Sequence, residues 1–169
     1  DPGARQTRVS WQRARHASGI ELLEVRRSFT LPASLTESRE QRCQKHVTID
    51  LVYEARVAPG VNRIDVRVWG ENHARDHRLR LRFPTGAPAV TAQAATTFDG
   101  AERPTARPDD SGWVHRASGT FCHQGWVHVN GLTVVAPGLP EAEVTPDGVL
   151  LLTVLRAVGW LARFDLRSR

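Results

Sequence analysis

The 169-residue sequence has no methionine, a single lysine, Lys45, and two cysteines, Cys43 and Cys122. Two cysteines are too few for a disulfide framework, and no Cys-x-x-Cys pair indicates a structural zinc site. No apolar run reaches the roughly 18 residues that a membrane-spanning helix needs, and no basic-then-apolar signal region opens the chain. We therefore expect a soluble, cytoplasmic protein without a membrane partner.

The composition is that of a globular domain. Hydrophobic residues make up 40% and charged residues 24% of the chain, which argues against disorder, a collagen-like repeat or a coiled coil. The length suits one domain, which we place at residues 1–169. Because the chain has no methionine and starts at Asp1 and Pro2, we expect it to be a fragment of a longer protein.

The charge is positive but evenly spread. The 23 Lys and Arg minus 18 Asp and Glu give +5, and the pI is near 10.4. The densest basic run alternates arginine with apolar residues, at Arg78, Arg80 and Arg82. This alternation indicates the solvated face of a strand. We therefore expect no nucleic-acid site.

Period-two alternation is the strongest structural signal. It predicts a strand over Val47–Val57, a second over Ile64–Val68 after the Pro59-Gly60 turn, and a third over Leu79–Phe83. Short connections between them indicate an antiparallel meander. Residues 20–31 also fit a short helix, but Pro32 ends the segment and no cap signal opens it, so we predict a strand.

The second half predicts further strands. Asn130-Gly131 splits the segment Trp126–Val135 and is typical of a tight hairpin turn. The continuous apolar run Val149–Leu155 indicates a strand buried on both faces at the centre of the core. Residues 99–112 read as a long irregular loop. With no helix of three turns, the pattern predicts an all-β fold, an antiparallel β-sandwich with little or no helix.

Few residues offer catalytic or metal-binding chemistry. His73 and His77 have a zinc-like spacing, but in an extended chain they lie about 13 Å apart, so we expect no metal site. Cys122 lies near His115, His123 and His128, yet it matches no nucleophile signature, and we expect a buried small residue. Glu141 and Glu143 could be paired carboxylates, but after a Pro-Gly turn we expect them to cap or solvate it. The phosphate-cradling glycine motifs are absent.

Five tryptophans are candidates for stacking on sugar rings or for core anchors. Trp69 and Trp160 flank apolar runs, and we expect both to be buried. Trp113 follows the long loop and is the better candidate for an exposed ring.

Three longer strings resemble a known family. Residues 76–84 read DHRLRLRFP, residues 138–141 read GLPE, and residues 152–163 read LTVLRAVGWLAR. In this order they resemble the C-terminal β-sandwich region of bacterial-type α-mannosidases of glycoside hydrolase family 38. The resemblance runs from about Ile20 to the end of the chain.

The resemblance implies a supersandwich fold of the galactose-mutarotase type and a non-catalytic role. Family members are retaining mannosidases whose nucleophile and divalent metal, usually zinc, lie in an upstream catalytic domain, so no catalytic or metal residue is carried over to this chain. The implied partners are that catalytic domain and a mannose-containing glycan. Arg156 and Trp113 are the candidate residues that border its active-site cleft. A truncated sandwich also risks self-association through exposed edges.

Two other readings stay open. A free-standing carbohydrate-binding module would need exposed, coplanar aromatic side chains. A small enzyme would need to use the neighbourhood of Cys122 and His123. The fold alone does not choose among these functions, because sandwiches serve many of them.

Overall fold

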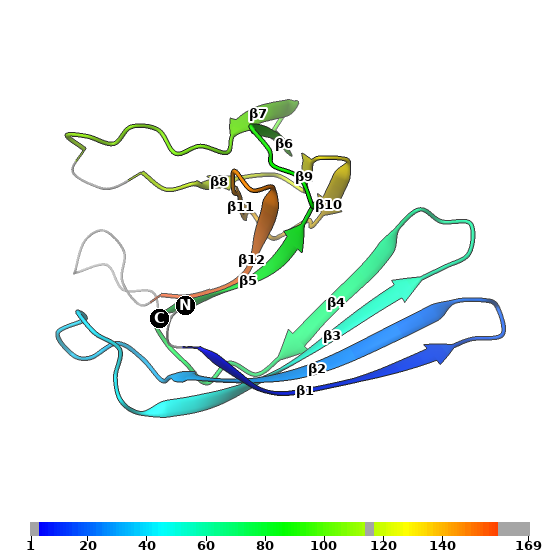
Figure 1. Cartoon of the computed structure of the whole chain (residues 1–169), viewed down its shortest axis with the longest axis horizontal. Coiled ribbons are helices and arrows are strands. Elements are labelled where there is room, and N and C mark those ends of the chain that lie inside the picture. Colours follow the sequence, from blue (N-terminus) through cyan, green and yellow to red (C-terminus); the bar gives the residue numbers. More distant parts are fainter. Residues whose placement is uncertain (1–3, 114–116, 159–169) are drawn as a thin grey trace. The chain divides into compact units, whose positions relative to one another are not determined.

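The computed structural model describes residues 4–113 and 117–158, and these residues form β-strands and no helix (Figure 1). Among them, accordingly, no helix is long and apolar enough to cross a membrane. The described chain divides into a first compact unit, residues 4–77 and 157–158, and a second, residues 78–156 without the gap. All strand pairs with a defined register run antiparallel, so the predicted all-β, antiparallel fold is confirmed.

The first unit is built on a single four-stranded sheet. Its strands lie side by side in chain order, and the short connections from β1 to β2 and from β3 to β4 contain Gly19 and Gly60, which have positive φ angles of 83° and 73°. A Cβ atom at Gly19 would lie 2.8 Å from the Pro59 ring, so the two turns at this end of the sheet abut. The strands are β1 (Arg5–Arg15), β2 (Glu21–Pro32), β3 (His46–Val57) and β4 (Ile64–Gly70).

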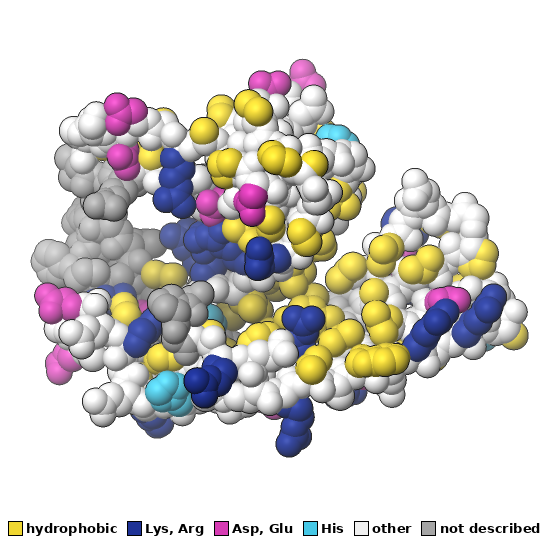
Figure 2. All heavy atoms as spheres, viewed as in Figure 1, with side chains coloured by type: hydrophobic (Ala, Val, Ile, Leu, Met, Phe, Trp, Pro, Cys, Tyr) yellow, Lys and Arg dark blue, Asp and Glu magenta, His cyan; other side chains and the backbone are white. Residues whose placement is uncertain are grey.

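The sheet of the first unit has one polar and one apolar face, as alternation requires. Opposed residues share a face, so the registers place the row Trp11, Val25, Tyr53 and Val68 on the apolar side. On the same side, away from the turns, Ile49 and Leu51 are buried. Toward the turns that burial is lost, and hydrophobic side chains gather on the surface of this part of the sheet (Figure 2).

Asp76 anchors the segment that leaves the first sheet. Its backbone is left-handed, with φ 56°, and its carboxylate accepts hydrogen bonds from the Leu35 N–H and the Arg39 guanidinium, both at 3.2 Å. The Asp76 carbonyl accepts a third from Arg42 Nη1 at 2.6 Å. These bonds hold the chain at the end of the loop between β4 and β5 (His77–Pro84).

The second unit is a sandwich of two four-stranded sheets. One sheet has the order β10-β9-β6-β7 and the other the order β5-β12-β11-β8. The additional strands are β6 (Thr91–Ala95), β7 (Gly100–Pro104), β8 (Thr120–Cys122), β9 (Trp126–Val129), β10 (Leu132–Val135), β11 (Glu141–Val144) and β12 (Val149–Ala157).

The core of the second unit lies between its two sheets. Small and branched apolar side chains from both interdigitate there, which is how a sandwich excludes water. Leu150 and Ala94 are completely inaccessible to solvent. The buried cluster comprises Ala89, Ala92, Ala94, Val127, Val129, Ala142, Val144, Leu150 and Leu152.

Most strands predicted from alternation are confirmed, including the segment 20–31 as β2 and the run Val149–Leu155 as the centre of the second unit's core. The Asn130-Gly131 turn is confirmed by its two positive φ angles, 48° and 79°. The predicted meander is wrong at its third strand, because β5 pairs in the second unit with β12. The loop predicted over residues 99–112 is partly wrong, since β7 occupies its first half.

Candidate functional site

The second unit carries a cluster of paired charges on the sheet β5-β12-β11-β8. Glu141 and Glu143 alternate along β11 with the core residues Ala142 and Val144, so the two carboxylates project from the outer face of the sandwich. Arginines from β5, β12 and the loop after β7 converge on them. We call Arg78, Arg80, Arg107, Glu141, Glu143 and Arg156 the arginine–glutamate cluster.

Both carboxylate oxygens of Glu141 are occupied. Oε1 accepts hydrogen bonds from Arg78 Nη1 at 3.0 Å and from the Thr153 hydroxyl at 2.7 Å. Oε2 accepts one from Arg156 Nη1 at 2.9 Å. Arg78 reaches this carboxylate from β5, on the far side of β12, so the pair ties the first and third strands of the sheet together.

Glu143 is the more deeply buried carboxylate, with 10% of its side chain exposed. Its Oε2 accepts a short hydrogen bond from Arg80 Nη1, and its Oε1 lies 3.5 Å from Arg107 Nη2. Gly119 packs against the same side chain, and a Cβ atom there would lie 2.7 Å from Oε1. A glycine at this position therefore leaves room for the buried carboxylate.

Four guanidinium groups surround two carboxylates, which leaves the cluster with a formal charge of +2. The prediction of a solvated face is thus wrong for Arg80, whose side chain is largely covered, while Arg78 and Arg82 are exposed as predicted. The prediction that Glu141 and Glu143 cap or solvate a turn is also wrong, because both lie in β11 and bind arginines. The observed role of both carboxylates is to pair with arginines of other strands and loops.

The two residues predicted to border a cleft are both exposed. Arg156 is held by Glu141 in the cluster, and its side chain is otherwise open to solvent. Trp113 lies in the loop between β7 and β8, where its backbone N–H donates a hydrogen bond to the Asp110 backbone carbonyl at 3.0 Å. The expected exposure of Trp113 is confirmed, and the bordering of a cleft stays a prediction.

The histidine pair considered for zinc is split by burial. His73 is exposed, with Nε2 3.5 Å from a Glu71 oxygen, whereas His77 is buried, and this burial lowers the pKa of its imidazole. The described residues contain no group of three or more His, Cys, Asp or Glu side chains that could hold a metal ion. These described residues therefore offer no ligand set for the divalent metal that the family resemblance implies for a catalytic domain.

Cys122 and His123 are neighbours in the chain with different environments. Cys122 is exposed, so its predicted burial is wrong. His123 is only 3% exposed, neither ring nitrogen has a hydrogen-bond partner within the described residues, and burial lowers the pKa of its imidazole. His128 lies farther along and bonds Thr133, with 2.8 Å between Nδ1 and Oγ1, while His115 falls outside the described residues. No bond joins Cys122 to His123 in the described structure.

The exposed tryptophans of the first sheet do not form one platform. Trp11 is opposite Val25 on the apolar face, whereas Trp69 is opposite Val52, which belongs to the other face. The predicted burial of Trp69 is wrong, since its side chain is partly exposed. Trp160 lies outside the described residues. Trp11 and Trp69 therefore cannot stack together on one sugar.

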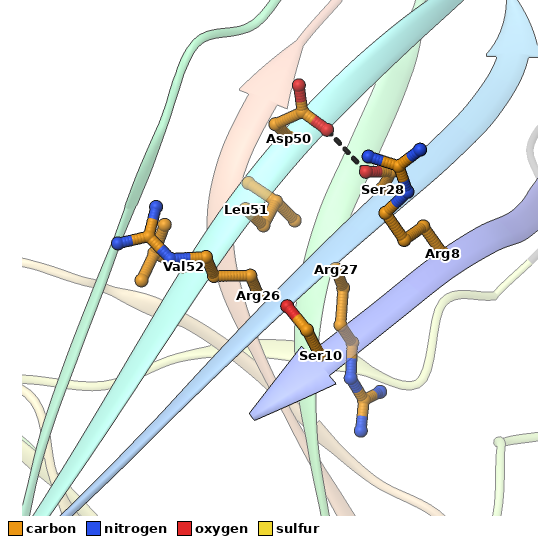
Figure 3. A pocket seen from close by; sticks show the side chains of 8 residues that line it. All are labelled: Arg8, Ser10, Arg26, Arg27, Ser28, Asp50, Leu51 and Val52. Atoms are coloured by element: carbon orange, nitrogen blue, oxygen red, sulfur yellow. Dashed lines mark hydrogen bonds between the residues drawn. The ribbon is translucent and has the colours of Figure 1, made fainter. Parts of the chain in front are cut away.

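A shallow concavity on the first sheet is lined by arginine and serine. Ser28 and Asp50 are among the residues that line the concavity, and the Ser28 hydroxyl donates a hydrogen bond to an Asp50 carboxylate oxygen at 2.5 Å. The side chains of Arg8, Arg26 and Arg27 extend in different directions around it (Figure 3). Guanidinium groups that diverge do not create a convergent anion site.

The chain is similar to known proteins over most of its length. No protein-family model matches it. It is 29% identical, over 164 aligned residues, to a Halalkalibacterium halodurans protein provisionally named a mannosylglycerate hydrolase; the match covers 85% of this chain and 18% of that protein. A crystal structure of a glycosyl hydrolase family 38 protein from Enterococcus faecalis matches with a TM-score of 0.79 and 21% identity, covering 92% of this chain and 20% of that one.

A second crystal structure, of an α-mannosidase from Enterococcus faecalis V583, matches with a TM-score of 0.82 and 22% identity. The match covers 92% of this chain and 19% of that one. The chain resembles part of a glycoside hydrolase family 38 protein. The resemblance expected from the sequence is confirmed, and the chain spans about a fifth of the length of these relatives.

The buried carboxylate of this family 38-like chain allows a stability test. Replacing Glu143 by Gln leaves the largely covered Arg80 without its counter-charge, so we expect the free energy of unfolding to fall by about 1 to 3 kcal/mol. The matched control is Asp65→Asn, because the Arg63–Asp65 pair is 67% and 57% exposed and should change stability by less than about 0.5 kcal/mol. Urea denaturation measures both, and equal losses would contradict the assignment.

His123 allows a pH test. Its pKa in the folded chain lies below the ordinary value, so the unfolded chain binds the proton more readily. The contribution of His123 to the free energy of unfolding is therefore fully present above about pH 6.5. As the pH falls from there toward the folded pKa, the free energy of unfolding decreases by about 1.4 kcal/mol per pH unit. His123→Leu should flatten this loss in urea denaturation between about pH 7.5 and 5.5. His73→Gln, at an exposed site, is the control, and a His123→Leu variant with the wild-type pH slope would refute the prediction.

Proposed function

We propose that this chain is a non-catalytic β-sandwich part of a larger family 38 α-mannosidase that packs on a metal-dependent catalytic domain outside the chain. The observation that carries the proposal is the combination of 92% coverage of this chain with about 20% coverage of the similar enzymes. A piece of that size, with strands and no helix among its described residues, fits a supporting sandwich. Its partners would be the catalytic domain and a mannose-containing glycan, in the cytoplasm.

The chemistry of the described residues fits a non-catalytic role. Retaining hydrolysis needs a nucleophilic carboxylate and an acid about 5 to 5.5 Å apart. Glu141 and Glu143 are the neighbouring carboxylates of the sandwich, and arginines already bind both. What the cluster offers a substrate is its positive charge, through the exposed guanidinium of Arg156, which suits a neighbouring cleft that takes up an anionic or polyhydroxylated ligand.

An activity assay on two proteins tests the proposal. The isolated chain, freed of host mannosidase, should not hydrolyse an aryl α-mannoside with or without added zinc or cobalt, because the neighbouring carboxylates of its described sandwich, Glu141 and Glu143, are both paired with arginines. The longer polypeptide from the same gene should hydrolyse it and lose activity with a chelator. Mannosylglycerate, named for one relative, serves as the second substrate.

The outcomes separate the rival readings. Turnover that copurifies with the isolated chain and disappears in Cys122→Ala would favour the small enzyme and overturn the supporting role. An inactive chain that binds mannose-containing glycans tightly, from a gene encoding no further domain, would favour the carbohydrate-binding module.

A further inference from the structure

The first unit exposes one apolar sheet face. Large hydrophobic side chains from β1, β2, β3 and β4 lie on the same face in adjacent rows of the register. Trp11 is 71% exposed and Val66 51% exposed. We call this surface the open apolar face, and its exposed members are Val9, Trp11, Leu23, Val57, Ile64 and Val66.

The composition of this face is that of an interior. The row through Trp11, Val25, Tyr53 and Val68 contains no charge, and in the next row only Arg13 is charged. The opposite face bears Glu24, Arg26, Glu54, Arg56 and Arg67, as expected for a surface in water. Soluble monomers rarely leave a contiguous apolar patch of more than a few hundred Å² uncovered, so the face is built to be covered.

We propose that the open apolar face docks another part of the same polypeptide in the complete protein. The proposal rests on the proposed function, in that it takes the chain to be part of a longer protein. About four-fifths of the length of the similar proteins lies outside the match, which supplies the covering surface. That surface is apolar at its centre. It carries carboxylates at its rim, because Arg13, Arg15 and Arg27 outnumber Glu21 on the face.

The charge favours an occupant within the chain over a second copy. A second copy would bring the same excess of arginine, Arg13, Arg15 and Arg27 against Glu21, to the interface, so like charges would oppose one another. A covalently linked segment docks at an effective concentration in the millimolar range and needs less area. Interfaces between domains of one chain start at about 600 Å² in total.

Thiol labelling on adjacent residues tests the proposal. In a Cys43→Ser, Cys122→Ser background, Val66→Cys places a thiol on the open apolar face, and Arg67→Cys places one on the opposite face of the same strand. Both positions are exposed in this chain. In the longer polypeptide, labelling at Val66→Cys should slow at least about tenfold relative to the isolated chain, while labelling at Arg67→Cys changes little. Ile64→Cys and Asp65→Cys repeat the comparison at a second pair.

The labelling results either support or overturn the docking proposal. Equal labelling of the two faces in the longer polypeptide overturns the proposal. Slow labelling at Val66→Cys in the isolated chain that is relieved by dilution also overturns it, because a second copy is then the occupant. The mannosidase assay is independent: protection without activity refutes the proposed function alone, and activity without protection refutes the docking alone.

Discussion

A β-sheet with one apolar face is stable only when a second layer covers that face, and the two units of this chain meet that constraint differently. The second unit supplies both layers, and Leu150 and Val127 from opposing sheets lie in one closed core. The first unit has a single sheet whose apolar face is buried at Leu51 and open at Trp11. This incomplete burial and the comparisons both support the proposal that the chain is part of a larger enzyme.

The polar architecture follows from the same alternation. With one side of β11 packed in the core, Glu143 must project from the other side, where the long side chain of Arg80 reaches from β5 over β12 to pair with it. Charge on this face therefore links strands and leaves the guanidinium groups of Arg107 and Arg156 largely exposed.

Local sequence predicted the strands better than their partners. Alternation and the Asn130-Gly131 turn are short-range signals, and they identified β3, β4, β9 and β10. Nothing in residues 71–76 indicates that β5 leaves the first sheet, because the left-handed Asp76 and its bonds to the loop near Arg39 arise only in the folded chain.

The same limit applies to the charges. β1 was missed because only Val9 and Trp11 interrupt a polar, arginine-rich segment. The arginine–glutamate cluster was missed because Arg80 and Glu143 are 63 residues apart and meet only once β5 and β11 share a sheet.

Native-state hydrogen exchange on the isolated chain is the direct test of whether the first sheet is left open while the core of the second unit is closed. We expect the amides of Leu23 and Ala55, toward the open end of the first sheet, to exchange through openings that cost at least about 2 kcal/mol less than those of Val127 and Leu150. Equal protection in the two units would contradict it.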